Sequence, residues 1–211
     1  MAQPAPAPER QVSFRVFSAQ PIADLAYVPR PGSAPVSLAF YPTAHSPRYA
    51  YTGPASLQFI DATTGAVAAE ITVPPKIVTA LFILSALEPL ATRTVRYRVQ
   101  VVDDSAERHP PGTLLILNFS GLELSGTINR RPVTLNGGLN APIRMEMPAA
   151  IILRTPFKNR SYQAYADTIS LEKSGRALLL LLPPYRQGSL EVQSRVLLDA
   201  PVSEPRKSST D

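Results

Sequence analysis

The sequence predicts an all-β protein, and three observations carry that prediction. Proline is abundant, with 23 Pro against 10 Gly, and it recurs from Pro21 to Pro201, which leaves little room for a long helix. The segments between prolines are rich in Val, Ile, Leu, Thr and Tyr, the residue types that suit a pleated sheet. Several of these segments alternate apolar and polar residues, which is the period of a half-buried strand.

The composition is that of a folded chain with no redox chemistry of its own. Apolar residues make up 45% of the 211 residues and charged residues 18%, a balance that favours a packed core over disorder. Cysteine is absent, which excludes a disulfide, a thiolate metal site and a cysteine nucleophile. The net charge of +5 reflects either a coding bias towards arginine or a surface that attracts nucleic acid, anionic glycan or lipid headgroups.

Both ends of the chain are expected to be flexible. Residues 1–10 form a Pro/Ala-rich arm of polyproline-II type, and residues 202–211 form a polar tail with nothing to bury. An Ala-Gln-Pro-Ala-Pro start is typical of the mature end left by signal-peptide cleavage, so a periplasmic or extracellular location is expected, with a cytoplasmic one left open. No apolar run is long enough to span a membrane as a helix.

Strands and hairpins are predicted in order along the folded part. The first strand places Val12, Phe14 and Val16 on one face. A hairpin follows over 57–73, with the polar segment 61–65 as its loop. Residues 95–101 alternate again, and a second hairpin covers 127–135 before the Asn-Gly-Gly turn at 136–138.

An internal repeat predicts two modules. Residues 79–84 match 176–181 at an offset of 97, and the same offset without a gap matches 95–101 to 192–198. A fainter Pro-Gly echo links Pro31 with Pro111. We expect tandem β-sandwich modules over 11–104 and 105–201, each with about seven short strands and therefore immunoglobulin-like. The linker at 103–111 is expected to be stiff and exposed.

A run of five leucines follows Gly175 and precedes two prolines. The run is too short for a helix and predicts a central strand that is buried on both faces. The alternative is an exposed apolar edge that needs a partner chain, which would make the protein an assembly subunit. Under that alternative the candidate interface residues are Leu178, Leu179, Leu180, Leu181 and Leu182.

Motifs for catalysis, metals and cofactors are missing from the sequence. His45 and His109 are each followed closely by proline in predicted loops, and the acids around His109 lack the spacing of a calcium loop. Neither a G-x-S-x-G elbow nor a phosphate-binding glycine loop occurs. We therefore predict no enzyme activity, no metal and no cofactor. A hydrolase whose two carboxylates meet only in the fold remains an alternative.

Two groups of residues are candidates for ligand binding. Tyr rings stack on sugars, and cationic side chains bind anionic polymers. The candidates are Tyr41, Arg48, Tyr49 and Tyr51 in one group, and Arg154, Lys158 and Arg160 in the other. Packing within a hairpin explains Tyr49 and Tyr51 equally well. Stacking of nucleic acid on Phe119, Tyr162 and Tyr165 is not favoured over a place for these rings in the core.

The sequence as a whole predicts a non-enzymatic, secreted or cell-envelope protein that acts through protein–protein contact or assembly. The expected partner is a second copy of the chain or another envelope component. The first alternative is a module that binds a glycan or another polyanion, and the second is the hydrolase described above.

Overall fold

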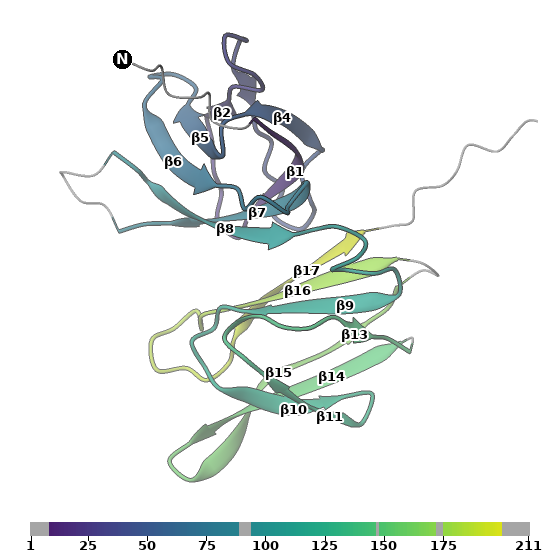
Figure 1. Ribbon diagram of the computed structural model, residues 1–211. Coiled ribbons are helices and arrows are strands. Elements are labelled where there is room, and N and C mark those ends of the chain that lie inside the picture. Colours follow the sequence, from purple (N-terminus) through teal and green to yellow (C-terminus); the bar gives the residue numbers. More distant parts are fainter. Residues whose placement is uncertain (1–8, 89–93, 147, 172–174, 200–211) are drawn as a thin grey trace, which may run out of the picture. The chain divides into compact units, whose positions relative to one another are not determined.

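The protein is all-β. The computed structural model describes residues 9–88, 94–146, 148–171 and 175–199, and these contain 17 strands in four sheets and no helix (Figure 1). Most of the predicted N-terminal arm and all of the C-terminal tail lie outside the described residues. Within the described part of the chain, no helix has the length and apolar character needed to cross a membrane. The chain divides into two compact units, residues 1–108 and 109–211.

Unit 1 consists of two four-stranded sheets. Their orders are β4-β1-β7-β8 and β3-β2-β5-β6. The strands are β1 (Arg10–Ser18), β2 (Leu25–Tyr27), β3 (Val36–Ser37), β4 (Tyr49–Gly53), β5 (Ser56–Asp61), β6 (Val67–Thr72), β7 (Thr79–Ala86) and β8 (Tyr97–Asp103).

The core of unit 1 is aromatic. The fully buried ring of Phe14 lies at its centre, with ring centroids 5.0 Å from both Tyr27 and Phe82, 5.5 Å from Tyr49 and 6.0 Å from Phe59. These rings come from both sheets, so the hydrophobic cluster holds the two sheets together as a sandwich.

Unit 2 is built in the same way from nine strands. Its sheets have the orders β12-β9-β16-β17, with β13 also on β9, and β11-β10-β14-β15. The strands are β9 (Thr113–Asn118), β10 (Leu124–Ile128), β11 (Arg131–Leu135), β12 (Gly138–Leu139), β13 (Ile143–Arg144), β14 (Ala149–Phe157), β15 (Arg160–Ile169), β16 (Arg176–Leu182) and β17 (Gln193–Asp199). Its core is mainly aliphatic, with Leu and Ile in most positions.

The first strand of each unit is an inner strand that runs parallel to the penultimate one. β1 pairs with β7, placing Phe14 opposite Ala80, and β9 pairs with β16, placing Leu114 opposite Ala177. In these central pairs, β7, β9 and β16 are buried on both faces, which explains their continuous apolar sequences. The five-leucine run is part of β16, between β9 and β17, so the prediction of a central strand is confirmed. The alternative of an edge strand is wrong.

Both predicted hairpins are confirmed. The hairpin over 57–73 is β5–β6, and the hairpin over 127–135 is β10–β11. In the second hairpin, Asn129 and Arg130 form a two-residue turn with φ of 48° and 65°, as a tight hairpin turn requires.

One β-bulge recurs in the two units. Ala68 of β6 is skipped between the pairs Phe59↔Ala69 and Ile60↔Val67, and Ala164 of β15 is skipped in the same way between Leu153↔Tyr165 and Arg154↔Gln163. The carbonyl of each bulged alanine accepts a hydrogen bond from the segment that precedes the unit's last strand. Arg96 donates its N–H to Ala68 at 2.8 Å, and Val192 donates to Ala164 at 3.0 Å. Because that last strand belongs to the other sheet, the bond ties the two sheets together.

Three details differ from the sequence prediction. Ala80 pairs with Asp103 whereas Ala177 pairs with Leu198, so the pairing of the last strands is shifted by two residues relative to the ungapped repeat. The strand order does not confirm the immunoglobulin-like prediction, because the first two strands of each unit lie in different sheets. The segment 103–111 is not exposed throughout, since Asp104 and His109 are buried.

A substitution at Gly126 of β10 tests whether β10 and β14 approach each other closely in unit 2. A Cβ atom at this position would collide with the backbone carbonyl of Ile152 on β14. We expect Gly126→Ala to lower the free energy of unfolding by about 2 kcal/mol or more, measured by urea denaturation. The control is Gly137→Ala, because a Cβ there meets no atom within 4 Å. Equal stability of the two variants would contradict the close approach.

Asp61 tests the β5–β6 loop through pH. The backbone hydrogen bond from Thr64 lowers the pKa of Asp61 below its ordinary value, with further contributions from the backbone N–H of Thr63 and the side chain of Arg96. A lowered pKa adds stability that is present above about pH 4 and is lost as the pH falls through the folded-state pKa. We expect the melting temperature of Asp61→Asn to fall less than that of the wild type between about pH 5 and pH 2. Parallel pH profiles would contradict this account.

Candidate binding site

The hairpin that joins β14 to β15 projects from unit 2. β10 pairs with β14 only as far as Arg154, whereas the β14–β15 ladder continues to the pair Phe157↔Arg160. Figure 1 shows this two-stranded ribbon running past the end of β10. Lys158 and Asn159, with φ of 47° and 60°, form its two-residue turn. Residues 154–163, which lie beyond the bulge, are called the β14–β15 tip below.

The corresponding hairpin of unit 1 has no such tip. Only one pair, Ile60↔Val67, lies beyond its bulge, and the chain then turns through the polar loop 61–66. That loop is held by the carboxylate of Asp61, which accepts the backbone N–H groups of Thr63 and Thr64. A sandwich of this design therefore does not need a long ribbon at this corner.

Two aromatic side chains are exposed on the β14–β15 tip. Phe157 retains 47% and Tyr162 38% of their accessible surface. Their ring centroids lie 6.4 Å apart in an edge-to-face arrangement, and the Nζ atom of Lys158 lies 5.3 Å from the centroid of Phe157. By strand alternation both rings share a face with Thr155, which pairs with Tyr162. The two rings therefore lie on the face of the hairpin that points into the core nearer its base, but at a position past the end of the core.

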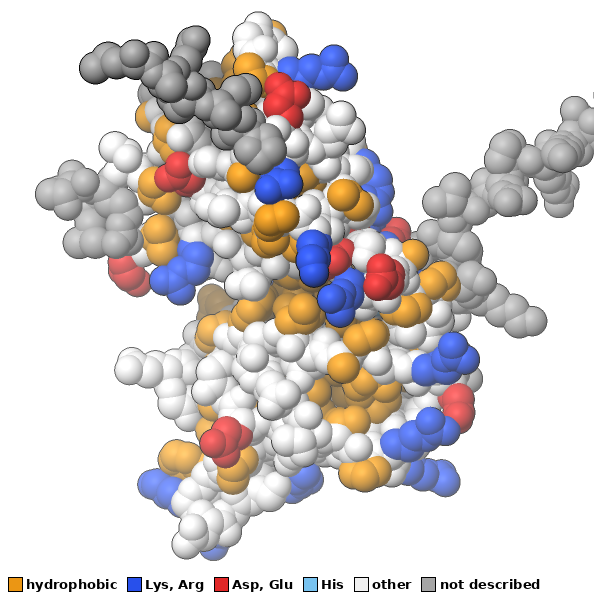
Figure 2. All heavy atoms as spheres, viewed as in Figure 1, with side chains coloured by type: hydrophobic (Ala, Val, Ile, Leu, Met, Phe, Trp, Pro, Cys, Tyr) orange, Lys and Arg blue, Asp and Glu red, His pale blue; other side chains and the backbone are white. Residues whose placement is uncertain are grey.

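Three cations accompany these rings. Lys158 is in the turn and Arg160 is paired with Phe157 across the ribbon. Arg154 is held at the base, where it donates from Nε to the hydroxyl of Ser161 at 3.0 Å and from Nη2 to the carbonyl of Ser161 at 2.8 Å. The tip contains no acidic residue. Figure 2 shows basic and hydrophobic side chains, with one acidic side chain beside them, at its lower left, where Figure 1 places this ribbon.

Tyr165 anchors the hairpin behind the tip. Its ring is buried in the core of unit 2, and its hydroxyl donates a hydrogen bond to the carboxylate of Asp167 at 3.2 Å. Burial, followed by the nearby charge of Asp167, raises the pKa of Tyr165 well above its ordinary value. The phenol therefore stays neutral throughout the physiological pH range. The buried ring and its hydrogen bond hold the base of the hairpin in the core of unit 2.

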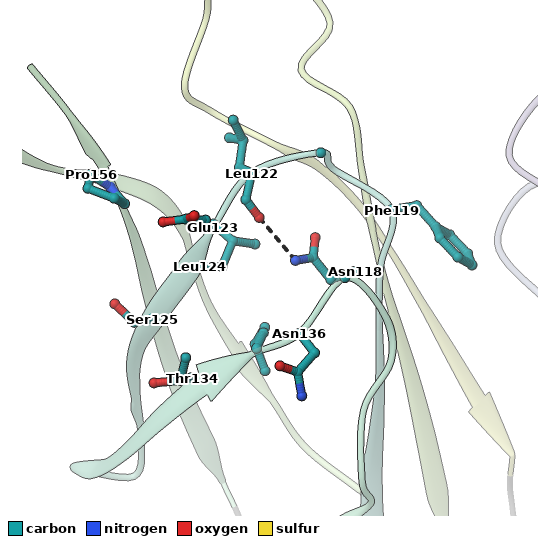
Figure 3. A pocket seen from close by; sticks show the side chains of 12 residues that line it. Asn118, Phe119, Leu122, Glu123, Leu124, Ser125, Thr134, Asn136 and Pro156 are labelled. Carbon is teal, nitrogen blue, oxygen red and sulfur yellow. Dashed lines mark hydrogen bonds between the residues drawn. The ribbon is translucent and has the colours of Figure 1, made fainter.

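A hollow of about 850 Å³ lies beside the base of the tip, between the segments 118–125 and 134–137 (Figure 3). Leu122, Leu124, Leu135 and Pro156 supply apolar surface. Much of the wall is fixed by internal hydrogen bonds. The side chain of Asn118 donates to the carbonyl of Leu122 at 3.1 Å and accepts from the backbone N–H and the hydroxyl of Ser120.

The hollow does not assemble an acid–base pair. Among the described residues that line it, Glu123 is the one ionisable side chain, and the polar remainder consists of amides and hydroxyls. Figure 3 shows Phe119 directed away from Glu123, Ser125 and Thr134. Glycoside hydrolysis of the usual kind needs two carboxyl groups across the substrate. A single carboxylate among amides favours binding over that chemistry.

The first group of candidate residues is not gathered on one surface. Tyr41 is exposed. Tyr51 is buried in the core of unit 1 and Tyr49 is partly buried against it, as the alternative of hairpin packing predicts. The hydroxyl of Tyr51 donates to the carbonyl of Pro54 at 2.9 Å, and that of Tyr49 accepts the backbone N–H of Ala39 at 2.8 Å. Tyr51 is therefore not available to stack on a sugar, and Tyr49 offers only part of its ring.

Arg48 of the same group takes part in a charge cluster. Its Nη2 lies 3.4 Å from the carboxylate of Asp104, which also accepts two hydrogen bonds from the buried Arg15, at 3.2 Å from Nε and 2.6 Å from Nη2. Removing one partner of an ion pair buried in this way strongly destabilises the folded protein. The Arg15–Asp104 pair is therefore structural, whereas the side chain of Arg48 at the edge of the cluster is 44% exposed. The part of the chain that the structure describes holds no group of three or more His, Asp or Glu residues able to bind a metal ion.

The second group of candidate residues does lie together. Arg154, Lys158 and Arg160 are all on the β14–β15 tip. Sequence reasoning overlooked Phe157, which supplies the largest exposed apolar surface of the tip. The available signal was Lys158-Asn159 at the centre of an alternating segment, because Asn favours the positive φ of a two-residue hairpin turn.

No protein-family model and no curated protein matches the chain.

The exposure of the tip predicts that its aromatics contribute little to folding. We expect Phe157→Ala/Tyr162→Ala to change the free energy of unfolding by less than about 1 kcal/mol, because the rings pack mainly on each other. Tyr165→Ala, in the same strand, should cost about 3 kcal/mol because its ring is buried. Chemical denaturation of both variants checks this. A comparable loss in the two would assign the exposed rings a structural role.

Proposed function

We propose that the chain is a non-enzymatic binding protein of the secreted or cell-envelope type, which acts by surface contact through the β14–β15 tip. The observation that carries the proposal is the exposed pair Phe157 and Tyr162 on a ribbon with three cations and no acid. Arg is among the residue types enriched at binding surfaces, as are aromatics, and exposed apolar clusters on monomers are commonly contact sites. The partner is negatively charged, because all charges of the tip are positive.

The two units are proposed to be tandem modules that share one scaffold. Their common strand order, their parallel central pair and the bulge at Ala68 and Ala164 support this. On that basis the tip is an elaboration of a hairpin which the scaffold does not require, since unit 1 closes the same corner with a short polar loop. Residues added to a complete scaffold are good candidates for function.

Two other functions have less support. Assembly through Leu178–Leu182 would need an accessible strand, whereas β16 is paired on both edges. A hydrolase would need two converging carboxylates, and the hollow beside the tip has one. Contact with an anionic partner uses residues that are exposed.

The test is retention on immobilised heparin, eluted with salt. We expect Arg154→Gln/Lys158→Gln/Arg160→Gln to bind at least about tenfold more weakly than the wild type, or about 1.4 kcal/mol, because each cation near an anionic surface contributes on the order of 1 kcal/mol. The control Arg30→Gln/Lys76→Gln/Arg98→Gln removes the same number and types of exposed cation from unit 1. Equal losses in the two variants would show that net charge alone drives retention, and would reject the site.

A further inference from the structure

The β14–β15 tip has an aromatic face with Lys158 and Arg160 beside it and Arg154 on the opposite face of the ribbon. Phe157 and Tyr162 form its centre, Lys158 lies at the turn, Arg160 lies across from Phe157, and Arg154 is bonded to Ser161 at the base. A Lys or Arg side chain keeps its charge in a polar layer while its methylene stem lies along apolar surface. This arrangement places an exposed aromatic pair and three positive charges close together at the end of the ribbon.

The shape of the tip favours one kind of anionic partner over another. It is the projecting end of a two-stranded ribbon, since β10 no longer pairs beyond Arg154. Single-stranded nucleic acid is bound along a positively charged groove with open ring faces for the bases. In the tip, Lys158 lies over the ring of Phe157, and Phe157 and Tyr162 contact each other edge to face. These contacts leave less open ring surface for the stacking of bases. A projecting end of this kind fits a partner into which it can be inserted.

We propose that the β14–β15 tip inserts into the headgroup layer of an anionic lipid bilayer, with Phe157 and Tyr162 at the acyl boundary and Lys158, Arg160 and Arg154 on the lipid phosphates. This inference rests on the proposed function and names its partner. Aromatic rings favour the membrane interface because they are apolar with a polar edge or hydroxyl, and basic residues are attracted by anionic headgroups. One short tip gives weak and reversible attachment, which suits a peripheral protein.

The absence of tryptophan from the chain makes the test direct. Phe157→Trp introduces a single fluorophore at the tip, because the wild type has 0 Trp. We expect its emission to shift to shorter wavelength with vesicles of phosphatidylcholine and phosphatidylglycerol, and to be quenched by lipids brominated near the headgroup. Vesicles of phosphatidylcholine alone should give at least about fivefold weaker binding, because the cations then lack anionic partners. Tyr185→Trp is the control, since Tyr185 is 86% exposed elsewhere in unit 2.

A second variant separates lipid insertion from charge attraction. Phe157→Ser/Tyr162→Ser should lose at least about fivefold in binding to the mixed vesicles, a larger loss than in its retention on heparin, which the three cations dominate. An unshifted Phe157→Trp emission with intact heparin retention would overturn the lipid inference and leave the proposed function standing. Loss of tip-dependent heparin retention would overturn both. Quenching of Phe157→Trp by oligothymidylate but not by brominated lipid would assign the tip to nucleic acid and reject the bilayer.

Discussion

The bulged alanine of each unit is the constraint on which the architecture depends. A β-bulge adds one residue to a strand, increases the local twist and redirects the strand beyond it. At Ala68 and Ala164 the extra residue also turns its carbonyl towards the other sheet, where a backbone N–H from the segment before the last strand donates to it. Both alanines are buried, so this hydrogen bond is formed away from water and losing it would leave an unpaired carbonyl. The bond closes one corner of the sandwich.

The two hairpins that carry this bulge differ in how far they extend beyond it. In unit 1 the chain ends the hairpin almost at once after the bulge, with a loop whose backbone is held by Asp61. In unit 2 the ladder continues for several pairs and carries Phe157 and Tyr162 into solvent. The cores show a matching contrast. Unit 1 places its rings around Phe14 in the interior, whereas unit 2 fills its interior mainly with Leu and Ile. Unit 2 thus presents on its surface the residue type that unit 1 buries.

An exposed aromatic pair beside cations is a surface with a physical preference. The rings gain free energy wherever water is removed from them, and the cations gain wherever negative charge is near. A headgroup layer of anionic lipid offers both within a few ångströms of depth. The hollow beside the tip is of another kind, because its wall consists of apolar, amide and hydroxyl groups with the single charge of Glu123. The two features meet at Pro156 of β14.

Local sequence determined the elements of this protein. Proline spacing and alternation identified the strands, the Asp61 to Gly65 segment marked a hairpin loop, the segment 127–135 was recognised as a hairpin, and the leucine run marked a central strand, because each of these signals acts over a few residues. The tertiary structure decided which sheet each strand joins, the two-residue shift between the last strands and the packing of Tyr49 and Tyr51 in or against the core, since all three depend on contacts between residues far apart in the chain. It also decided the site. Arg154, Lys158 and Arg160 were predictable as a basic group, whereas the exposure of Phe157 and Tyr162 follows from where β10 stops pairing with β14, and that is set by the packing of the whole sandwich.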